Sequence, residues 1–162
     1  MSRMQIVSLT LVLMRLAVVS SSARNEGDAK AEIDRFNHKF AALHLKMNHV
    51  GILAMWADDG VDLMPGEDPL VGKEAITAWL ADVQSRMVGH RVTKEELQFH
   101  DIQISGNWAS EWANEDQTIQ MPDGKPPVEG YGKIALVLKR KPSGEWKIKQ
   151  EMWNDAPRPQ IH

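Results

Sequence analysis

The 162-residue chain has no cysteine, one tyrosine and three phenylalanines, and its formal net charge is only −3. The lack of cysteine excludes disulfides, thiolate metal sites and cysteine nucleophiles. The one basic cluster, KRK at 139–141, is too small for a nucleic-acid surface, so no nucleic-acid partner is expected. The apolar run at 6–19 is too short to span a bilayer, so no stable membrane anchor is expected.

What the chain does contain is typical of one folded domain. It is 43% hydrophobic and 25% charged, close to ordinary globular values. A chain of about 150 residues buries enough surface to fold without disulfides or metals. Six tryptophans are the unusual feature of the composition.

The first 23 residues resemble a secretory signal peptide. Arg3 precedes the apolar run at 6–19, and small residues follow at 20–23, so cleavage is expected after Ala23. The expected location is therefore secreted or periplasmic, and the remaining chain would carry 17 basic and 22 acidic residues, a net charge of −5. Arg15 inside the apolar run argues for the alternative, an amphipathic N-terminal helix of a cytoplasmic protein.

Apolar residues spaced by three and four predict a long amphipathic helix over 28–50. They are Ile33, Phe36, Phe40, Leu43, Met47 and Val50. A short second helix at 52–56, closed by the turn at 58–60, and a brief strand at 61–64 follow. A third helix opens at 72–74 and ends at Gly89.

Beyond Gly89 the hydrophobic period becomes two, which predicts antiparallel strands joined by tight turns. The expected strands are 91–104, 108–121, 131–140 and 145–153. Helices followed by a strand meander indicate an α+β fold, with a curved sheet wrapped over helices. The expected organisation is a signal peptide at 1–23, a domain at 24–156 and a flexible tail at 157–162.

Four short motifs carry a resemblance to a known family. They are WADDG at 56–60, LVGKEAI at 70–76, GEWKI at 144–148 and MWN at 152–154. With the order of elements, they resemble the SnoaL-like, nuclear transport factor 2-like superfamily, in particular its bacterial branch of unknown function, over about 28–155. The resemblance implies a cone-shaped, cystatin-like α+β barrel with three N-terminal helices on a mainly antiparallel sheet, an apolar cavity at its open end, and often a homodimer formed through the sheet.

The resemblance does not imply one activity, because the superfamily includes ketosteroid isomerases, cyclases, epoxide hydrolases, dehydratases and binding modules. The isomerase branch places its carboxylate base where this chain has Met64, which cannot take a proton. Asp62 would share a strand face with Met64 and is the alternative base. The expected third long strand lacks an acid that could act as oxyanion donor, and no Asp-Arg-Asp spacing supports an epoxide hydrolase.

Three charged residues on successive strands are the weak catalytic candidates: Glu111, Lys133 and Glu151. If all three face the cavity, they form a charged patch with shifted pKa values. The alternative is that they lie on the solvent side of the sheet. In that case the core face carries Ile134, Leu136, Leu138, Trp146, Ile148 and Met152.

Aromatic and methionine side chains are the candidates for ligand contact. The expected ligand-binding residues are Trp56, Met64, Trp79, Trp112, Tyr131 and Trp153. Such a wall suits a small apolar or amphipathic ligand of variable shape. The alternative is that these side chains simply fill the core.

Histidines in the first helices do not predict a metal site. His38, His44 and His49 are spaced by six and five, which is not the spacing that puts two imidazoles on one ion, and they are expected to be solvated. No phosphate loop or nucleophile elbow is present, so no metal or cofactor is expected.

The sequence therefore predicts a small-molecule-binding domain with an apolar, aromatic-lined conical pocket, expected to be a homodimer, and names no reaction. One alternative is an enzyme of the same fold, an isomerase, cyclase or dehydratase acting on a cyclic or polyketide-like substrate. The other is an association module whose cone is filled by side chains.

Overall fold

A computed structural model describes residues 26–158, and the expected signal peptide at 1–23 lies outside them. The described chain forms three helices and six strands. In order they are α1 (Glu26–Leu45), α2 (His49–Met55), β1 (Trp56–Leu63), β2 (Leu70–Val71), α3 (Lys73–Arg86), β3 (Arg91–Ser105), β4 (Trp108–Gln120), β5 (Val128–Arg140) and β6 (Trp146–Asp155). None of these helices is long and apolar enough to cross a membrane.

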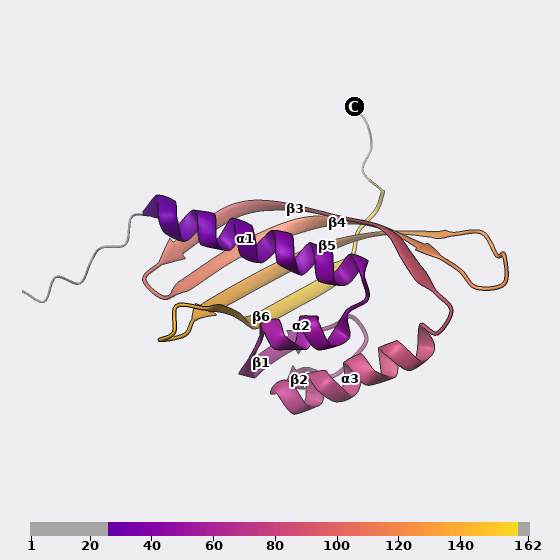
Figure 1. Cartoon of the computed structure of the whole chain (residues 1–162), viewed down its shortest axis with the longest axis horizontal. Helices are drawn as coiled ribbons and strands as arrows, with labels where there is room; N and C mark the ends of the chain where they lie inside the picture. Colours follow the sequence, from indigo (N-terminus) through magenta and orange to yellow (C-terminus); the bar gives the residue numbers. More distant parts are fainter. Residues whose placement is uncertain (1–25, 159–162) are drawn as a thin grey trace, which may run out of the picture.

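The six strands form one sheet in the order β2-β1-β6-β5-β4-β3. Only β1 and β6 pair in parallel, and every other neighbouring pair is antiparallel. Figure 1 shows α1 lying over the long strands while α2 and α3 lie beside β1 and β2. The predicted α+β class with a mostly antiparallel sheet is confirmed.

The segment after α2 differs from the sequence prediction. The residues expected to close a helix, 58–60, lie inside β1, and β2 was not predicted at all. The sequence predicted only the end of β1, as a brief strand at 61–64, because β1 is held mainly by a distant partner: Asp62 pairs with Glu151. Tertiary pairing has overridden a weak local signal here.

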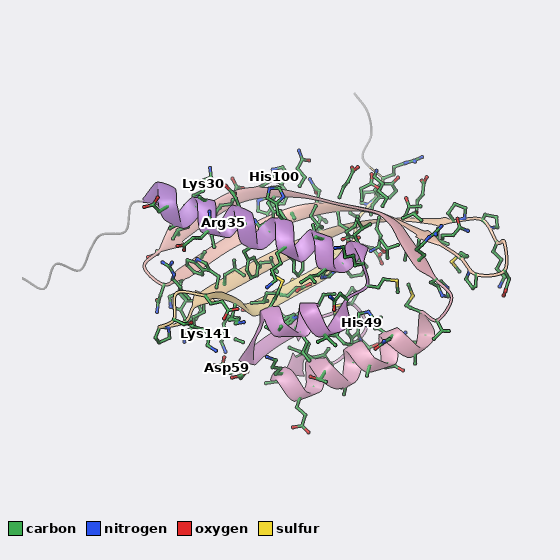
Figure 2. All side chains as sticks on the ribbon, in the orientation of Figure 1. Lys30, Arg35, His49, Asp59, His100 and Lys141 are labelled. Carbon is green, nitrogen blue, oxygen red and sulfur yellow. The ribbon has the colours of Figure 1, made fainter. Side chains whose placement is uncertain are left out.

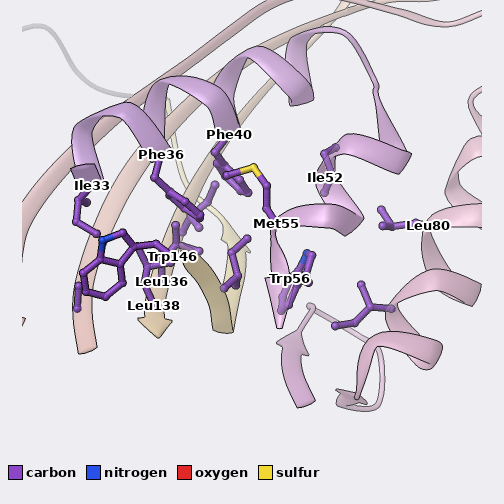
Figure 3. Packing of buried hydrophobic residues seen from close by; sticks show 14 residues of the cluster. Ile33, Phe36, Phe40, Ile52, Met55, Trp56, Leu80, Leu136, Leu138 and Trp146 are labelled. Carbon is purple, nitrogen blue, oxygen red and sulfur yellow. The ribbon is translucent and has the colours of Figure 1, made fainter. Parts of the chain in front are cut away.

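One half of the inner sheet face is filled by α1. Phe36 and Phe40 lie one helical turn apart and pack with Leu136, Leu138 and Trp146, as Figure 3 shows. All five side chains are buried. The predicted spacing of three and four thus places one helical stripe on the sheet, and burial of this stripe is the main source of helix stability.

The other half of the inner face is covered by α2 and α3. Asn48 caps α2 by accepting a hydrogen bond from the backbone N–H of Gly51 at 2.9 Å. Ile52 on α2, and Ile76 and Leu80 on α3, are buried in the same cluster as Trp56. These short helices leave part of the inner face open, and that opening is the cavity described below.

A β-bulge in β6 reverses which residues face inward. Leu138 pairs with Ile148, but the adjacent Val137 pairs with Gln150, so Lys149 is an extra residue. Ile148 is buried before the bulge, and Glu151 is buried after it. Strict alternation had put these two side chains on opposite faces, and that interpretation is wrong because a bulge shifts the side-chain phase by one residue.

Candidate functional site

A cavity of about 260 Å³ lies between α2, α3 and the inner face of the sheet. Its wall is mainly apolar, from Ile52 and Trp56 near the first helices, through Ile76 and Trp79 on α3, to Ile134 on β5. A concave, largely apolar space with a few polar groups is the usual form of a small-molecule site.

Two buried carboxyl groups lie side by side at the sheet wall of this cavity. Asp62 on β1 and Glu151 on β6 are direct partners in the parallel pair. Their exposed fractions are 4% and 7%, and both line the cavity. The Oδ1 atom of Asp62 has no hydrogen-bond partner among the described residues. Buried carboxylates without a partner are costly, so their retention in a cavity points to a ligand-facing role.

Burial raises the pKa of both carboxyl groups of this pair above their usual range. Burial raises the pKa of Asp62 to about 6. Burial, together with the nearby charges of Asp62 and Glu115, raises the pKa of Glu151 well above its usual range. Both shifts favour the protonated carboxyl, and a pair of adjacent buried carboxyl groups with unequal acidity can offer an acid and a base together.

Glu115 on β4 reaches the cavity from the other side of β5. Its Oε2 atom accepts a hydrogen bond from Nε1 of Trp153 on β6 at 2.6 Å. The bond crosses β5 at Gly132, where an added Cβ would lie 2.5 Å from the Glu115 oxygen and 2.6 Å from the Trp153 nitrogen. Gly132 is therefore required for this contact between a cavity acid and a cavity tryptophan.

Glu95 extends the group of acids onto β3. It is buried, and it accepts a hydrogen bond from Nε2 of Gln117 at 2.7 Å. Burial and the neighbouring charge of Glu115 raise the pKa of Glu95 to about 8. Glu95 does not line the cavity, so its effect on a ligand would pass through Glu115 and Gln117.

Two histidines close the helical side of the cavity. His44 in α1 and His49 at the start of α2 both line it, and Figure 2 labels His49. The His44 ring lies 4.3 Å from that of Phe40, and burial lowers the pKa of His44 to about 4, with a smaller contribution from His49. The expectation that these two rings are solvated is wrong, because the four-residue spacing from Phe40 places His44 on the buried stripe. His38 is exposed as expected.

Comparison by sequence finds no matching family model and no matching curated protein. Comparison of structures finds a ketosteroid isomerase-like protein from Erwinia carotovora atroseptica, with a TM-score of 0.67 and 17% identity over 78% of this chain and 96% of that one. A nuclear transport factor 2-like protein with a cystatin-like fold from Novosphingobium aromaticivorans gives a TM-score of 0.62 and 14% identity over 82% and 84%. This chain has the nuclear transport factor 2-like fold.

A nuclear transport factor 2-like protein of unknown function from Pseudomonas putida is similar to the same degree, with a TM-score of 0.63 and 20% identity over 81% of this chain and 88% of that one. The nuclear transport factor 2-like resemblance and the α+β class expected from the sequence are confirmed. At these identities the likeness shows the nuclear transport factor 2-like fold alone, and the chemistry must be argued from the residues of this chain.

Four of the six expected ligand-binding residues line the cavity: Trp56, Met64, Trp79 and Trp153. Trp79 points an unpartnered indole N–H toward buried space. Met64, at the position where the isomerase branch was expected to carry its base, and Asp62, the expected alternative, both line the cavity.

The other two expected ligand-binding residues do not line the cavity. Trp112 lies on the outer sheet face, 39% exposed, and donates a hydrogen bond from Nε1 to Asp101 at 2.7 Å. Tyr131 donates to Glu129 at 3.3 Å and accepts from Arg158 at 2.9 Å. Alternation along the strands turns both side chains away from the residues that face inward.

The three candidate catalytic residues do not meet. Glu151 lines the cavity, whereas Glu111 lies beneath α1 and accepts a hydrogen bond from Nδ2 of Asn37 at 2.7 Å. Burial raises the pKa of Glu111 to about 7, and the bond from Asn37 opposes this shift. Lys133 is exposed on the outer face, paired in register with Asn114. A single patch of Glu111, Lys133 and Glu151 is therefore excluded.

Sequence reasoning missed Glu115, His44 and His49 as cavity residues. Glu115 lies four residues after Glu111 on the same strand, so alternation could have placed both on one face. The histidines could not be placed without knowing where α1 ends and α2 begins. Within residues 26–158, no group of three or more histidine, aspartate and glutamate side chains is arranged to hold a metal ion.

Proposed function

We propose that this protein binds a small, largely apolar molecule in a conical pocket formed by the cavity between α2, α3 and the sheet. The observation that carries the proposal is an apolar wall that includes two residues, Asp62 and Trp79, each with a buried polar atom that has no hydrogen-bond partner among the described residues. Apolar area supplies affinity in such sites, and a few polar groups fix the orientation of the ligand.

A matched pair of valine substitutions tests the proposal. Val83 on α3 lines the cavity, whereas Val88, just beyond α3, is exposed. The probe is 1-naphthylmethanol, a neutral molecule with a flat apolar body, and its binding is followed by tryptophan fluorescence because Trp56, Trp79 and Trp153 line the cavity. Val83→Phe should abolish saturable binding and Val88→Phe should retain it. No saturable binding to the unmodified protein, or equal binding by both variants, contradicts the proposal.

A second candidate function is proton transfer on a cyclic substrate, as in an isomerase. The favouring observation is the Asp62–Glu151 pair in the cavity wall, in which Asp62 has a pKa of about 6 and one oxygen without a hydrogen-bond partner among the described residues. Asp62 would remove a proton from carbon next to a carbonyl group, and protonated Glu151 would donate a hydrogen bond to the carbonyl oxygen. Asp62 would then return the same proton to the γ-carbon of the substrate. This step gives the α,β-unsaturated ketone and restores the ionised Asp62.

A small β,γ-unsaturated ketone, 3-cyclohexenone, tests this candidate through the ultraviolet absorbance of its conjugated isomer. The rate should rise as pH rises through about 6, because Asp62 acts in its ionised form. Asp62→Asn should remove the activity, and Asp58→Asn, which changes an exposed acid outside the cavity, should not. A rate equal to buffer for the unmodified protein excludes this candidate and leaves the binding proposal intact.

We also propose that the outer sheet face carries the homodimer contact. His100, Trp112, Ala135 and Met152 are successive cross-strand partners from β3 to β6, and they form an exposed, largely apolar row. Met152 is 49% exposed and Trp112 39%. Sedimentation velocity should find a dimer that Met152→Lys converts to monomer. A monomer at every concentration of the unmodified protein contradicts this proposal.

A further inference from the structure

The charged side chains that line the cavity are of one sign. Asp62, Glu115 and Glu151 line it, and no lysine or arginine does. His44 stays neutral at physiological pH because burial lowers its pKa to about 4. A carboxylate or phosphate ligand would be placed against acids with no cation to compensate it, so the lining disfavours anionic ligands.

Within residues 26–158, Asp62 and Glu151 have no side-chain hydrogen-bond partner, whereas the buried Glu95 and Glu111 each accept from a side chain. Glu115 accepts from Trp153, and Glu111 accepts from Asn37. Asp62, 4% exposed, has a backbone hydrogen bond at Leu63 and, like Glu95 and Glu111, one oxygen without a partner; what it and Glu151 lack is any bond or ion pair with a side chain of residues 26–158. What the pair lacks is a positive charge, or a strong donor, inside the cavity.

The rest of the lining suits a cation with an apolar body. The tryptophans Trp56, Trp79 and Trp153 present aromatic rings to the same space as the acids. Ring faces attract ammonium groups, and the attraction is greater where water is excluded. The apolar wall on α3, from Ile76 to Val83, would receive the body of the ligand.

We propose that the ligand of this cavity is a small lipophilic amine whose ammonium group lies against Asp62 and Glu151 and whose apolar body lies against the tryptophans and α3. The inference rests on the proposed binding function and adds the ligand class. The proposed amine differs from a neutral sterol-like or polyketide-like ligand in one respect, its positive charge.

Binding of a cation must change the protonation of the pair. An ammonium group favours the ionised carboxyl, so binding should release a proton to solvent at pH values near the pKa of Asp62, about 6. The titratable groups that share the cavity with Asp62 are Glu151 from β6, Glu115 from β4, His44 from α1 and His49 from α2. Helix α3 contributes only uncharged side chains to the lining. Affinity for the amine should therefore increase between pH 5 and pH 7, roughly the range over which a group of this pKa ionises.

Three probes that share one body test the inference by calorimetry: 1-naphthylmethylamine, which is protonated at neutral pH, 1-naphthylmethanol and 1-naphthoate. The amine should bind at least about tenfold more tightly than the alcohol, and the carboxylate should bind most weakly. Asp62→Asn should remove the advantage of the amine over the alcohol, because the carboxylate that pairs with the ammonium group is lost. Asp58→Asn, the exposed control, should leave both affinities unchanged.

The outcomes separate this inference from the binding proposal on which it rests. Equal affinity for amine and alcohol, or tightest binding of the carboxylate, overturns the inference and leaves the binding function standing. Failure of all three probes to bind overturns both. Should Asp62→Asn fail to fold, Glu151→Gln takes its place. Proton release on binding is also measured, from the change of the apparent binding enthalpy with the ionisation enthalpy of the buffer. Binding of the amine that releases no proton near pH 6 contradicts the inference.

Discussion

The two halves of the inner sheet face are built from the same strands and have opposite characters. Under α1, the phenylalanines Phe36 and Phe40 fill the space against Leu136 and Leu138. Under α2 and α3, the same strands border an open cavity with Asp62 and Glu151 in its wall. A long helix with a regular apolar stripe closes one half, and two short helices leave the other half open.

Two glutamates show the difference at one position of the sheet. Glu111 and Glu151 are the cross-strand partners of Leu136 on its two sides, and both are buried. Glu111 has Asn37 of α1 above it, whereas Glu151 has the cavity above it. The same residue type in the same row is thus a structural group in one half and a ligand-facing group in the other.

The largest expected effect is a loss of stability in the half of the inner sheet face that α1 covers. Phe40→Ala should lower the free energy of unfolding by about 3–5 kcal/mol, because a fully buried ring is removed from a packed layer. Met64→Ala, at the cavity wall, is the comparison and should cost clearly less, because its side chain is only half-buried beside open space. Urea denaturation measures both, and equal losses would show that the two halves do not differ in packing.

The next effect concerns the pH dependence of stability in the open half. Folding raises the pKa of Asp62 from 3.8 to about 6, so the folded state holds its proton more tightly. Its contribution to stability is therefore present below about pH 4 and is lost as pH rises through about 6, on the order of 3 kcal/mol.

Asp62→Asn should flatten the fall in stability between pH 4 and pH 7 in urea denaturation. Asp58→Asn is the control, since Asp58 has an 89% exposed side chain. An unchanged slope in Asp62→Asn would show that Asp62 titrates normally in the folded protein.

A third prediction concerns the hydrogen bond from Trp153 to Glu115 at the cavity. Gly132→Ala should cost about 1–3 kcal/mol, because its Cβ would overlap the Glu115–Trp153 hydrogen bond. The emission spectrum of the protein should also shift as the Trp153 indole loses its partner. Gly130→Ala on the same strand meets no atom within 4 Å and should do neither. Identical behaviour of the two variants would contradict the assigned role of Gly132.

The smallest effect sharpens the comparison of the two glutamates. Glu111→Leu should destabilise the protein by about 1–2 kcal/mol, because Asn37 is left buried without its acceptor. Glu151→Leu should be neutral or stabilising above pH 7, since it removes a buried acid that has no hydrogen-bond partner to lose. Chemical denaturation of both variants at one pH gives the difference, and a greater loss in Glu151→Leu would reverse the assignment.

Periodicity predicted much of this fold. The three-and-four spacing around Phe36 and Phe40 located α1, and the turns at 105–107, 122–124 and 142–144 separated the four long strands. Periodicity failed at Trp56, where β1 begins because of pairing with β6, and at Lys149, where a bulge reverses the inward-facing residues. Both failures come from contacts between segments distant in the sequence, which no local pattern contains.

The sequence by itself determined the helices, the strand meander and the family of folds, because each depends on local periodicity and turn chemistry. Only the tertiary structure decided which acids serve the cavity. Glu151 faces the cavity because of the bulge at Lys149, and Asp62 lies beside it because β1 pairs in parallel with β6. Glu111 is separated from them because α1 brings Asn37 over it. The charge of a site, its burial and its unsatisfied hydrogen-bonding atoms depend on which residues pack around it. That packing is fixed only when segments distant in the sequence come together.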